Sequence, residues 1–105
     1  MKIEKRILNI QRLRRMPEGF GWIDHRLVRE GHLQRADANA WALYLILVTV
    51  GDERGLSYYS EPSLARLLGL NGEAIRAARG RLVLADLIAY EEPLYQVLGL
   101  EGGRR

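Results

Sequence analysis

The sequence predicts an α+β fold that is mostly helical and carries a small antiparallel sheet. Two short amphipathic segments on either side of Gly69 predict a pair of helices joined by a tight turn. A nearly continuous apolar run over 38–50 predicts a central helix. Three short segments rich in aromatic and aliphatic residues predict strands, at 56–59, 87–90 and 94–98.

The N-terminal segment 2–16 combines basic charge with apolar residues at helical spacing. The apolar stripe consists of Ile3, Ile7, Ile10 and Leu13. A basic amphipathic helix is therefore the first expectation, and an extended arm is the second. Pro17 and Gly19 break this segment, which divides the chain into a basic arm over 1–16, a domain over 17–99 and a disordered tail over 100–105.

The run that begins at Ile23 predicts a short helix that ends at Gly31. We expect Leu27 to face inward together with Ile23 and Val28. Trp22 is expected to anchor the start of the helix.

The helix over 38–50 should be capped by Asp37 and buried nearly all round, because it has almost no polar face. A glycine-rich turn follows and leads into the strand at 56–59. The strands at 87–90 and 94–98 should form a tight hairpin across Glu91, Glu92 and Pro93. Because an isolated hairpin is only marginally stable, the strand at 56–59 is expected to complete a three-stranded sheet.

The helix pair around Gly69 shows clear start and stop signals. Ser60 and Asn71 predict the two N-caps, and Gly69 ends the first helix because glycine reaches positive φ without steric cost. The apolar positions that should face inward are Leu64, Leu67 and Leu68 in the first helix and Ile75, Ala78 and Leu82 in the second.

The spacing Ala65-x3-Gly69-x5-Ile75 resembles that of the bacterial helix-turn-helix, whose second helix enters the major groove of DNA. An ordinary helical hairpin is the alternative. The order of elements over 37–99 further resembles a winged helix-turn-helix. The runs FGWIDHRLVREG, GLSYYS and RLVLADLIAYEEPLYQVL are similar to small bacterial winged-helix proteins of plasmids and mobile elements. The core SLARLLGL…LADLIAY resembles the winged helices of plasmid replication initiators and primosome-type proteins.

This resemblance implies a set of DNA-binding positions. On the second helix they are Asn71, Gly72, Glu73, Arg76 and Ala77, and on the first helix they are Ser63 and Arg66. We expect Arg76 to reach a guanine edge, and the start of the second helix to offer N–H groups to a phosphate. Glu73 has two interpretations, acceptance from a cytosine or a favourable place at the positive end of the helix dipole. Arg79 is expected to pair with an acid such as Asp86 rather than to contact a base.

Two features favour protein contacts instead. The hairpin tip is acidic, whereas a wing that grips phosphates would carry basic residues. The outer face of the second helix is small and apolar at Gly80 and Leu84, which suits another helix. These two residues and the stripe of the arm are candidates for a dimer or partner face. Arg12, Arg14 and Arg15 of the arm are candidates for phosphate contacts.

No catalytic or metal site is expected. Asp24, His25 and His32 match no usual ligand spacing, and no nucleophile–base pair, carboxylate pair or phosphate loop is visible. We therefore expect no enzyme, no metal and no cofactor. The absence of cysteine excludes disulfides and favours a reducing cytoplasm. The apolar run is far shorter than the ~20 residues that span a bilayer, so no membrane partner is expected.

The net charge of +3 is unevenly distributed. Residues 1–35 hold nine Lys and Arg against four Asp and Glu, and residues 66–90 hold four against two. Positive charge thus gathers on the arm and the second helix. We expect sequence-specific binding of double-stranded DNA by a homodimer, as a transcriptional regulator or a plasmid or mobile-element replication accessory. The alternative is a winged-helix protein–protein interaction module with little affinity for DNA.

Overall fold

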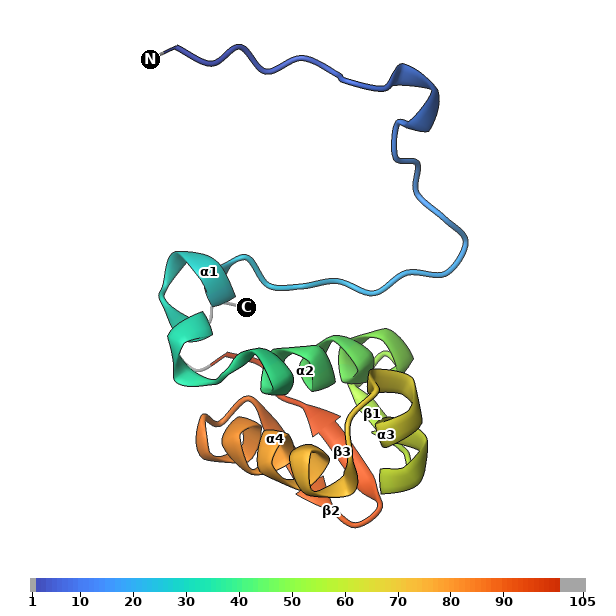
Figure 1. Cartoon of the computed structure of the whole chain (residues 1–105), viewed down its shortest axis with the longest axis vertical. Helices are drawn as coiled ribbons and strands as arrows, with labels where there is room; N and C mark the ends of the chain where they lie inside the picture. The colour runs from blue at the N-terminus through green and yellow to red at the C-terminus, as the bar shows by residue number, and fades with distance from the viewer. Residues whose placement is uncertain (1, 101–105) are drawn as a thin grey trace.

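A computed structural model describes residues 2–100 of the chain. It confirms an α+β fold, mostly helical, with a three-stranded antiparallel sheet (Figure 1). The predicted tail lies outside the described residues except for Leu100. The elements in chain order are η1 (Ile10–Arg12), α1 (Arg26–Arg29), η2 (His32–Arg35), α2 (Ala38–Val50), β1 (Leu56–Tyr58), α3 (Glu61–Leu68), α4 (Gly72–Leu84), β2 (Ile88–Glu91) and β3 (Leu94–Val97).

Helix α2 is the centre of the core and has the predicted bounds. Asp37 caps it, because its side chain accepts a hydrogen bond from the backbone N–H of Ala40 at 3.0 Å. One side of the helix packs against α4 and β3, which buries Leu43 and Leu47 completely. The prediction of burial all round is wrong, since Leu45 on the opposite side is 55% exposed. No element of the described chain covers that side.

The sheet has the strand order β1-β3-β2, so β3 lies in the middle. Its Tyr95 is fully buried and stands opposite Ser57 in β1 and Tyr90 in β2. The hairpin between β2 and β3 turns at Glu92 and Pro93, as predicted. Gly55 precedes β1 with φ of 81°, and a Cβ there would lie 2.8 Å from the carbonyl oxygen of Val97. Only glycine fits this approach.

The N-terminal segment is an extended arm, and the first expectation of an amphipathic helix over 2–16 is wrong. Only the short turn η1 is helical. The apolar stripe faces solvent, with exposed fractions from 54% at Leu13 to 79% at Ile3. A helix of this length is marginal in water unless its apolar face packs against something, and the arm leaves the body without touching it (Figure 1).

The region 23–31 forms less helix than predicted. Helix α1 has a single turn, and Gly31 follows it with φ of 76°. Leu27 is buried as expected, but Ile23 and Val28 are exposed, as is Trp22 at 76%. One helical turn presents only one side chain to the core, which explains the difference.

Asp24 stabilises the start of α1. Its carboxylate accepts from the backbone N–H of Arg26 at 2.9 Å and forms an ion pair with the guanidinium of that residue at 2.7 Å. The side-chain hydrogen bond, followed by the backbone one, lowers the pKa of Asp24 to about 2. Asp24 is therefore a structural cap.

Helices α2 and α4 are the longest, with 13 residues each. Within residues 2–100 no helix is long and apolar enough to cross a membrane.

The burial along α2 predicts a large difference between two leucines of one helix. Leu43→Ala should lower the free energy of unfolding by about 2–5 kcal/mol, because it removes buried methyl groups and leaves a cavity. Leu45→Ala, on the exposed side, should change it by less than about 1 kcal/mol. Urea unfolding followed by circular dichroism measures both, and equal losses would contradict the described packing of α2.

Candidate nucleic-acid interface

The corner between α3 and α4 has the predicted caps and turn. Ser60 Oγ accepts from the backbone N–H of Ser63 at 3.2 Å, and Asn71 Oδ1 accepts from the backbone N–H of Ala74 at 2.8 Å. Gly69 ends α3 in the left-handed region, with φ of 67°. The N–H of Leu70 then donates to the carbonyl of Ala65 at 3.1 Å, which closes the turn.

The inner side of this corner is packed into the core. Leu64 on α3 and Ile75 on α4 are fully buried. Ala65 is half-buried and packs against the edge of this core. The prediction for Leu67 is wrong, since it is 57% exposed. Leu64, Ala65 and Leu68 face the body, and Leu67 lies on the other flank of the short helix.

The outer side of α4 is open to solvent. Four of the predicted DNA-binding residues of the α4 segment are exposed and the fifth, Gly72, is half-buried; the exposed ones are Asn71, Glu73, Arg76 and Ala77. Gly80 and Leu84 continue the same side toward the end of the helix, and Leu84 is 88% exposed. Nothing lies within 4 Å of where a Cβ on Gly80 would be. Helix α4 therefore presents a narrow, accessible surface over its whole length.

The two predicted positions on α3 lie together. The side chain of Arg66 is exposed, and its Nη2 is 3.4 Å from Ser63 Oγ. Ser63 Oγ also accepts a hydrogen bond from Ser60 Oγ at 3.0 Å. Arg66 can turn outward freely, whereas Ser63 is half-buried and engaged in the cap.

An acidic residue that the sequence reasoning missed organises this surface. Glu61, in the first turn of α3, accepts from Arg76 Nη1 at 3.0 Å and from Arg79 Nη2 at 2.9 Å. Arg79 Nη1 also donates to the hydroxyl of the buried Tyr95 at 3.1 Å, and its guanidinium lies 4.3 Å from the ring centroid of Tyr90. Glu61 thus ties α3 to α4 and, through Arg79, to the sheet.

Arg79 pairs with an acid, as expected, but that acid is Glu61 and not Asp86, the example named from the sequence. Asp86 follows α4 in the left-handed region with φ of 63° and is exposed, whereas Arg79 is directed inward at Glu61 and the tyrosines. The available signal was the acid at the start of α3 combined with two arginines three residues apart on α4.

Glu61, Arg76 and Arg79 form a charged group, here called the Glu61 cluster, that changes the charge on the exposed side of α4. The hydrogen bond from Arg79, and then the one from Arg76, hold the pKa of Glu61 below its usual value. Glu61 therefore stays ionised at neutral pH and offsets the charge of Arg76. Arg76 remains 56% exposed, so its guanidinium is accessible although it is paired.

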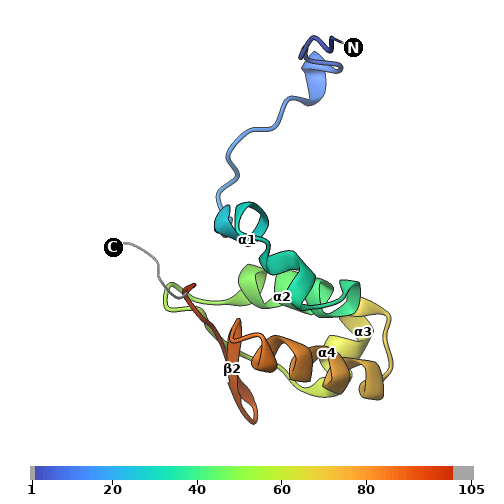
Figure 2. The ribbon, with the colours of Figure 1, turned by 90° about the vertical axis from the view of Figure 1, so that its left-hand side faces the viewer.

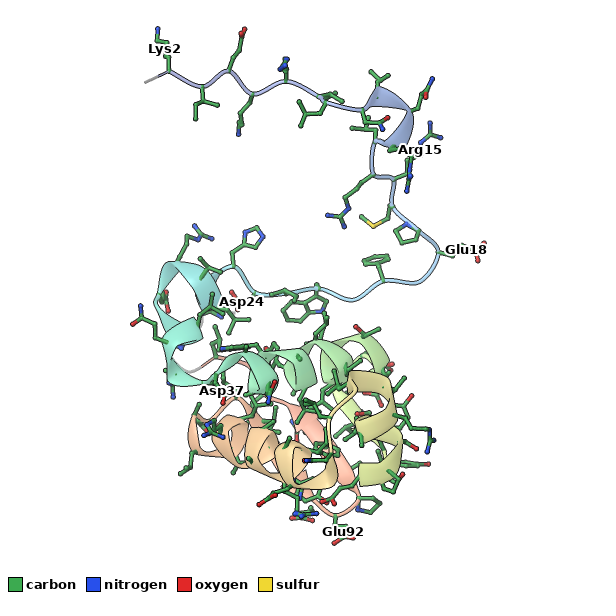
Figure 3. The ribbon with its side chains drawn as sticks, in the orientation of Figure 1. Lys2, Arg15, Glu18, Asp24, Asp37 and Glu92 are labelled. Carbon is green, nitrogen blue, oxygen red and sulfur yellow. The ribbon has the colours of Figure 1, made fainter. Side chains whose placement is uncertain are left out.

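The arginines of the arm do not share this surface. The arm leaves the body on the side of α2 opposite α4, which both views show (Figures 1 and 2). Figure 3 shows Arg15 well away from the folded body, while Glu92 marks the hairpin at the other end of the molecule. In this conformation Arg12, Arg14 and Arg15 cannot contact the same stretch of duplex as α4 of the same chain.

No family model, curated protein or solved structure matches this chain. Its function is therefore inferred from the chemistry and geometry of its own residues.

The histidines near α1 have local structural contacts. His32 Nδ1 lies 2.9 Å from Arg35 Nη1, and His32 Nε2 lies 3.6 Å from a carboxylate oxygen of Glu30. Among residues 2–100, no three His, Asp or Glu side chains are grouped so that they could hold a metal ion. Arg35 also donates to the carbonyl of Ala85, which connects η2 to the end of α4.

The lowered pKa of Glu61 predicts a pH dependence of stability. A carboxyl whose pKa is lower in the folded than in the unfolded state stabilises the fold above its unfolded pKa, and this contribution is lost as pH falls through the folded value. Wild type should therefore lose more stability than Glu61→Gln between about pH 5 and pH 3. Urea midpoints across this range measure the difference. Glu18→Gln, in the exposed linker, serves as the matched control and should keep the wild-type slope.

The open space at Gly80 predicts an unusual stabilising substitution. Gly80→Ala should raise the free energy of unfolding by roughly 0.5–1 kcal/mol, because alanine restricts the unfolded chain and its methyl group meets no neighbour. Gly55→Ala should instead destabilise, since its positive φ and the nearby carbonyl leave no room. If Gly80→Ala instead lowers the free energy of unfolding, the exposed side of α4 at Gly80 is already covered by another group.

Proposed function

We propose that this protein is a winged helix-turn-helix that binds double-stranded DNA through α4. The observation that carries the proposal is the division of α4 into a buried side and an open side, with α3 packed across its start. Ala65, Gly69 and Ile75 lie at this corner, and in a helix-turn-helix these positions would hold the small residue, the turn and the apolar plug, which supports the proposal. The β2–β3 hairpin directly follows α4, where a wing would lie.

In this proposal each of the five predicted DNA-binding residues of the α4 segment has a defined role. The backbone N–H groups at Asn71 and Gly72 meet a phosphate at the positive end of the helix. Arg76 leaves Glu61 and donates to a guanine edge in the major groove. Glu73 accepts from a cytosine or favours the helix dipole, and Ala77 permits close approach of the groove wall.

Further phosphate contacts come from α3. Arg66 is an exposed cation near the start of α4. Ser63 lies close enough to Arg66 for both side chains to bind the same phosphate once the Ser63 hydroxyl rotates toward it.

Charge limits the affinity of a single copy. Residues 17–100 hold eight Arg and no Lys against eleven Asp and Glu, a net charge of −3, whereas residues 1–16 hold six Lys and Arg against one Glu, a net charge of +5. An acidic body gains little from counterion release. We therefore propose a homodimer that binds two half-sites and acts in the cytoplasm in transcriptional control, or as a replication accessory of a plasmid or mobile element.

A second candidate function is a protein-interaction module. It is favoured by Leu84, which is 88% exposed beside the partly exposed Val83 at the end of α4. The acidic body and the acidic hairpin tip are also consistent with a protein partner rather than a phosphate backbone.

A salt titration separates the two candidates. After selection of a preferred duplex from a random pool, log affinity should fall linearly with log salt concentration, with a slope of several units. A response that is nearly flat, with no duplex retained at moderate salt, would favour the protein-interaction module.

Two variants of the Glu61 cluster make the test specific. Arg76→Ala should relax the preference at one base pair, which costs roughly 1–3 kcal/mol of discrimination. Glu61→Gln should strengthen duplex binding by up to about fivefold, because it frees Arg76 and removes a negative charge beside the groove. Glu18→Gln changes the net charge by the same amount far from α4 and should leave the affinity within about twofold. If Arg76→Ala and Glu61→Gln both bind the duplex like wild type, α4 is not the contact surface.

A further inference from the structure

A hollow of about 630 Å³ lies on the side of the body from which the arm leaves. Its volume is in the range of pockets that hold ligands or side chains of a partner. The hollow is bordered by the second half of α2, including Tyr44 and Val48, and by the strap of residues 20–22, whose Gly21 packs against Val48. The rest of the border comes from the turn 51–55 and from 96–100. Eight of the seventeen lining residues are apolar or aromatic, and four are glycines. Besides Val48, the apolar ones with side chains at least partly open to solvent are Phe20, Trp22, Val97, Leu98 and Leu100.

The arm carries apolar side chains that could fill such a hollow. Its large apolar side chains are all more than half exposed: Ile3, Ile7, Leu8, Ile10, Leu13 and Met16. Such a concentration of exposed apolar side chains on one segment is unusual for a soluble protein and marks an interaction site. Covering them in a partner would remove this apolar surface from water.

The charges of arm and hollow are opposite. Asp24 borders the hollow but is neutralised by its ion pair with Arg26, so the charges left at the border are the carboxylates of Asp52 and Glu53 against the guanidinium of Arg54. Hydrogen bonds from the backbone N–H groups of Leu56 and Arg54 lower the pKa of Asp52, which keeps it ionised. The arm alternates its apolar residues with lysine and arginine, so an apolar side chain can enter the hollow while its neighbours meet the acidic border.

We propose that the hollow receives the N-terminal arm of a second copy of this chain. The two copies exchange arms across a two-fold axis, and the run Ile10–Met16 fills the hollow of the partner. The arm of the same chain is poorly placed to fill the hollow of that chain. Three residues, 17–19, separate it from the strap that borders the hollow, and they direct it away from the body (Figure 3). Stretched out, the arm spans up to about 50 Å, which is enough to reach a neighbouring body.

This inference deepens the dimer of the proposed function but does not depend on DNA binding. It assigns the arm to dimerisation, which also accounts for its position opposite α4. The experiment contains no DNA, so the arm exchange and the DNA-binding proposal can each fail while the other stands.

Engineered cysteines test the exchange directly, because the full-length chain has none of its own. One preparation carries Leu13→Cys and a second carries Val48→Cys at the border of the hollow. After mixing and mild oxidation, a non-reducing gel should show a covalent heterodimer. Leu45→Cys is the matched control, since it lies on the same helix, is exposed and does not line the hollow. Mixing it with Leu13→Cys should give at least about tenfold less product.

A chain that carries both Leu13→Cys and Val48→Cys distinguishes exchange from folding back. Exchange across a two-fold axis predicts a covalent dimer from this double variant. A crosslinked monomer, or equal reaction at Leu45→Cys and Val48→Cys, would overturn the proposal.

Sedimentation equilibrium tests the same contact without cysteines. The wild-type chain should dimerise, and Leu13→Asp or Glu53→Lys should each raise the dissociation constant at least about tenfold. Glu92→Lys makes the same charge change at the hairpin tip, away from the hollow (Figure 3), and should leave it unchanged. A wild type that stays monomeric at about 100 μM, or a Glu92→Lys variant as weak as Glu53→Lys, would refute arm exchange.

Discussion

The structure depends on the packing of α4 against α2. Leu43 and Leu47 of α2 meet Ile75 and Leu82 of α4 in one apolar cluster, and all four are completely buried. Helix α3, the hairpin and α1 attach to this pair through apolar residues such as Leu64, Tyr95 and Leu27. Because one side of α4 supplies this contact, the other side is necessarily left outside. The exposed surface of α4 is thus a consequence of how the core is built.

Polar contacts then set the angle at which α4 is presented. Glu61 holds two arginines of α4, and Arg79 extends this contact to Tyr95 in the central strand. A separate ion pair joins Arg81 to Asp37 at 3.4 Å, and Arg35 binds the carbonyl that follows α4. Helix α4 is therefore tied near its start, its middle and its end. The same Glu61 places a negative charge next to Arg76, so orientation of the helix and attraction for a polyanion oppose each other at this point.

The chain separates its charges by segment. The body is acidic and the arm is basic, so the two have complementary charge within one sequence. A duplex and a second copy are competing partners for the arm, and the position of the arm on the side of α2 away from α4 favours the second copy. A dimer made in this way leaves α4 of each copy open, which is compatible with the proposed contact to two half-sites.

The sequence by itself determined the features that depend on neighbours along the chain. The caps Asp37, Ser60 and Asn71, the turn at Gly69 and the hairpin before Leu94 all follow from local geometry, and each was predicted correctly. Helical periodicity also identified Ile75, Ala78 and Leu82 as the buried stripe of α4.

Only the tertiary structure decided which apolar residues had somewhere to pack and which charges met. The arm has a helical pattern but no surface beside it, so Ile3 and Leu13 stay exposed and the helix does not form. Leu45 and Leu67 have the same chemistry as their buried neighbours but lie on flanks that no element within residues 2–100 covers. Arg79 meets Glu61, 18 residues away, because the corner between α3 and α4 brings the two together. Such outcomes depend on distances across the fold, which a pattern of neighbouring residues does not contain.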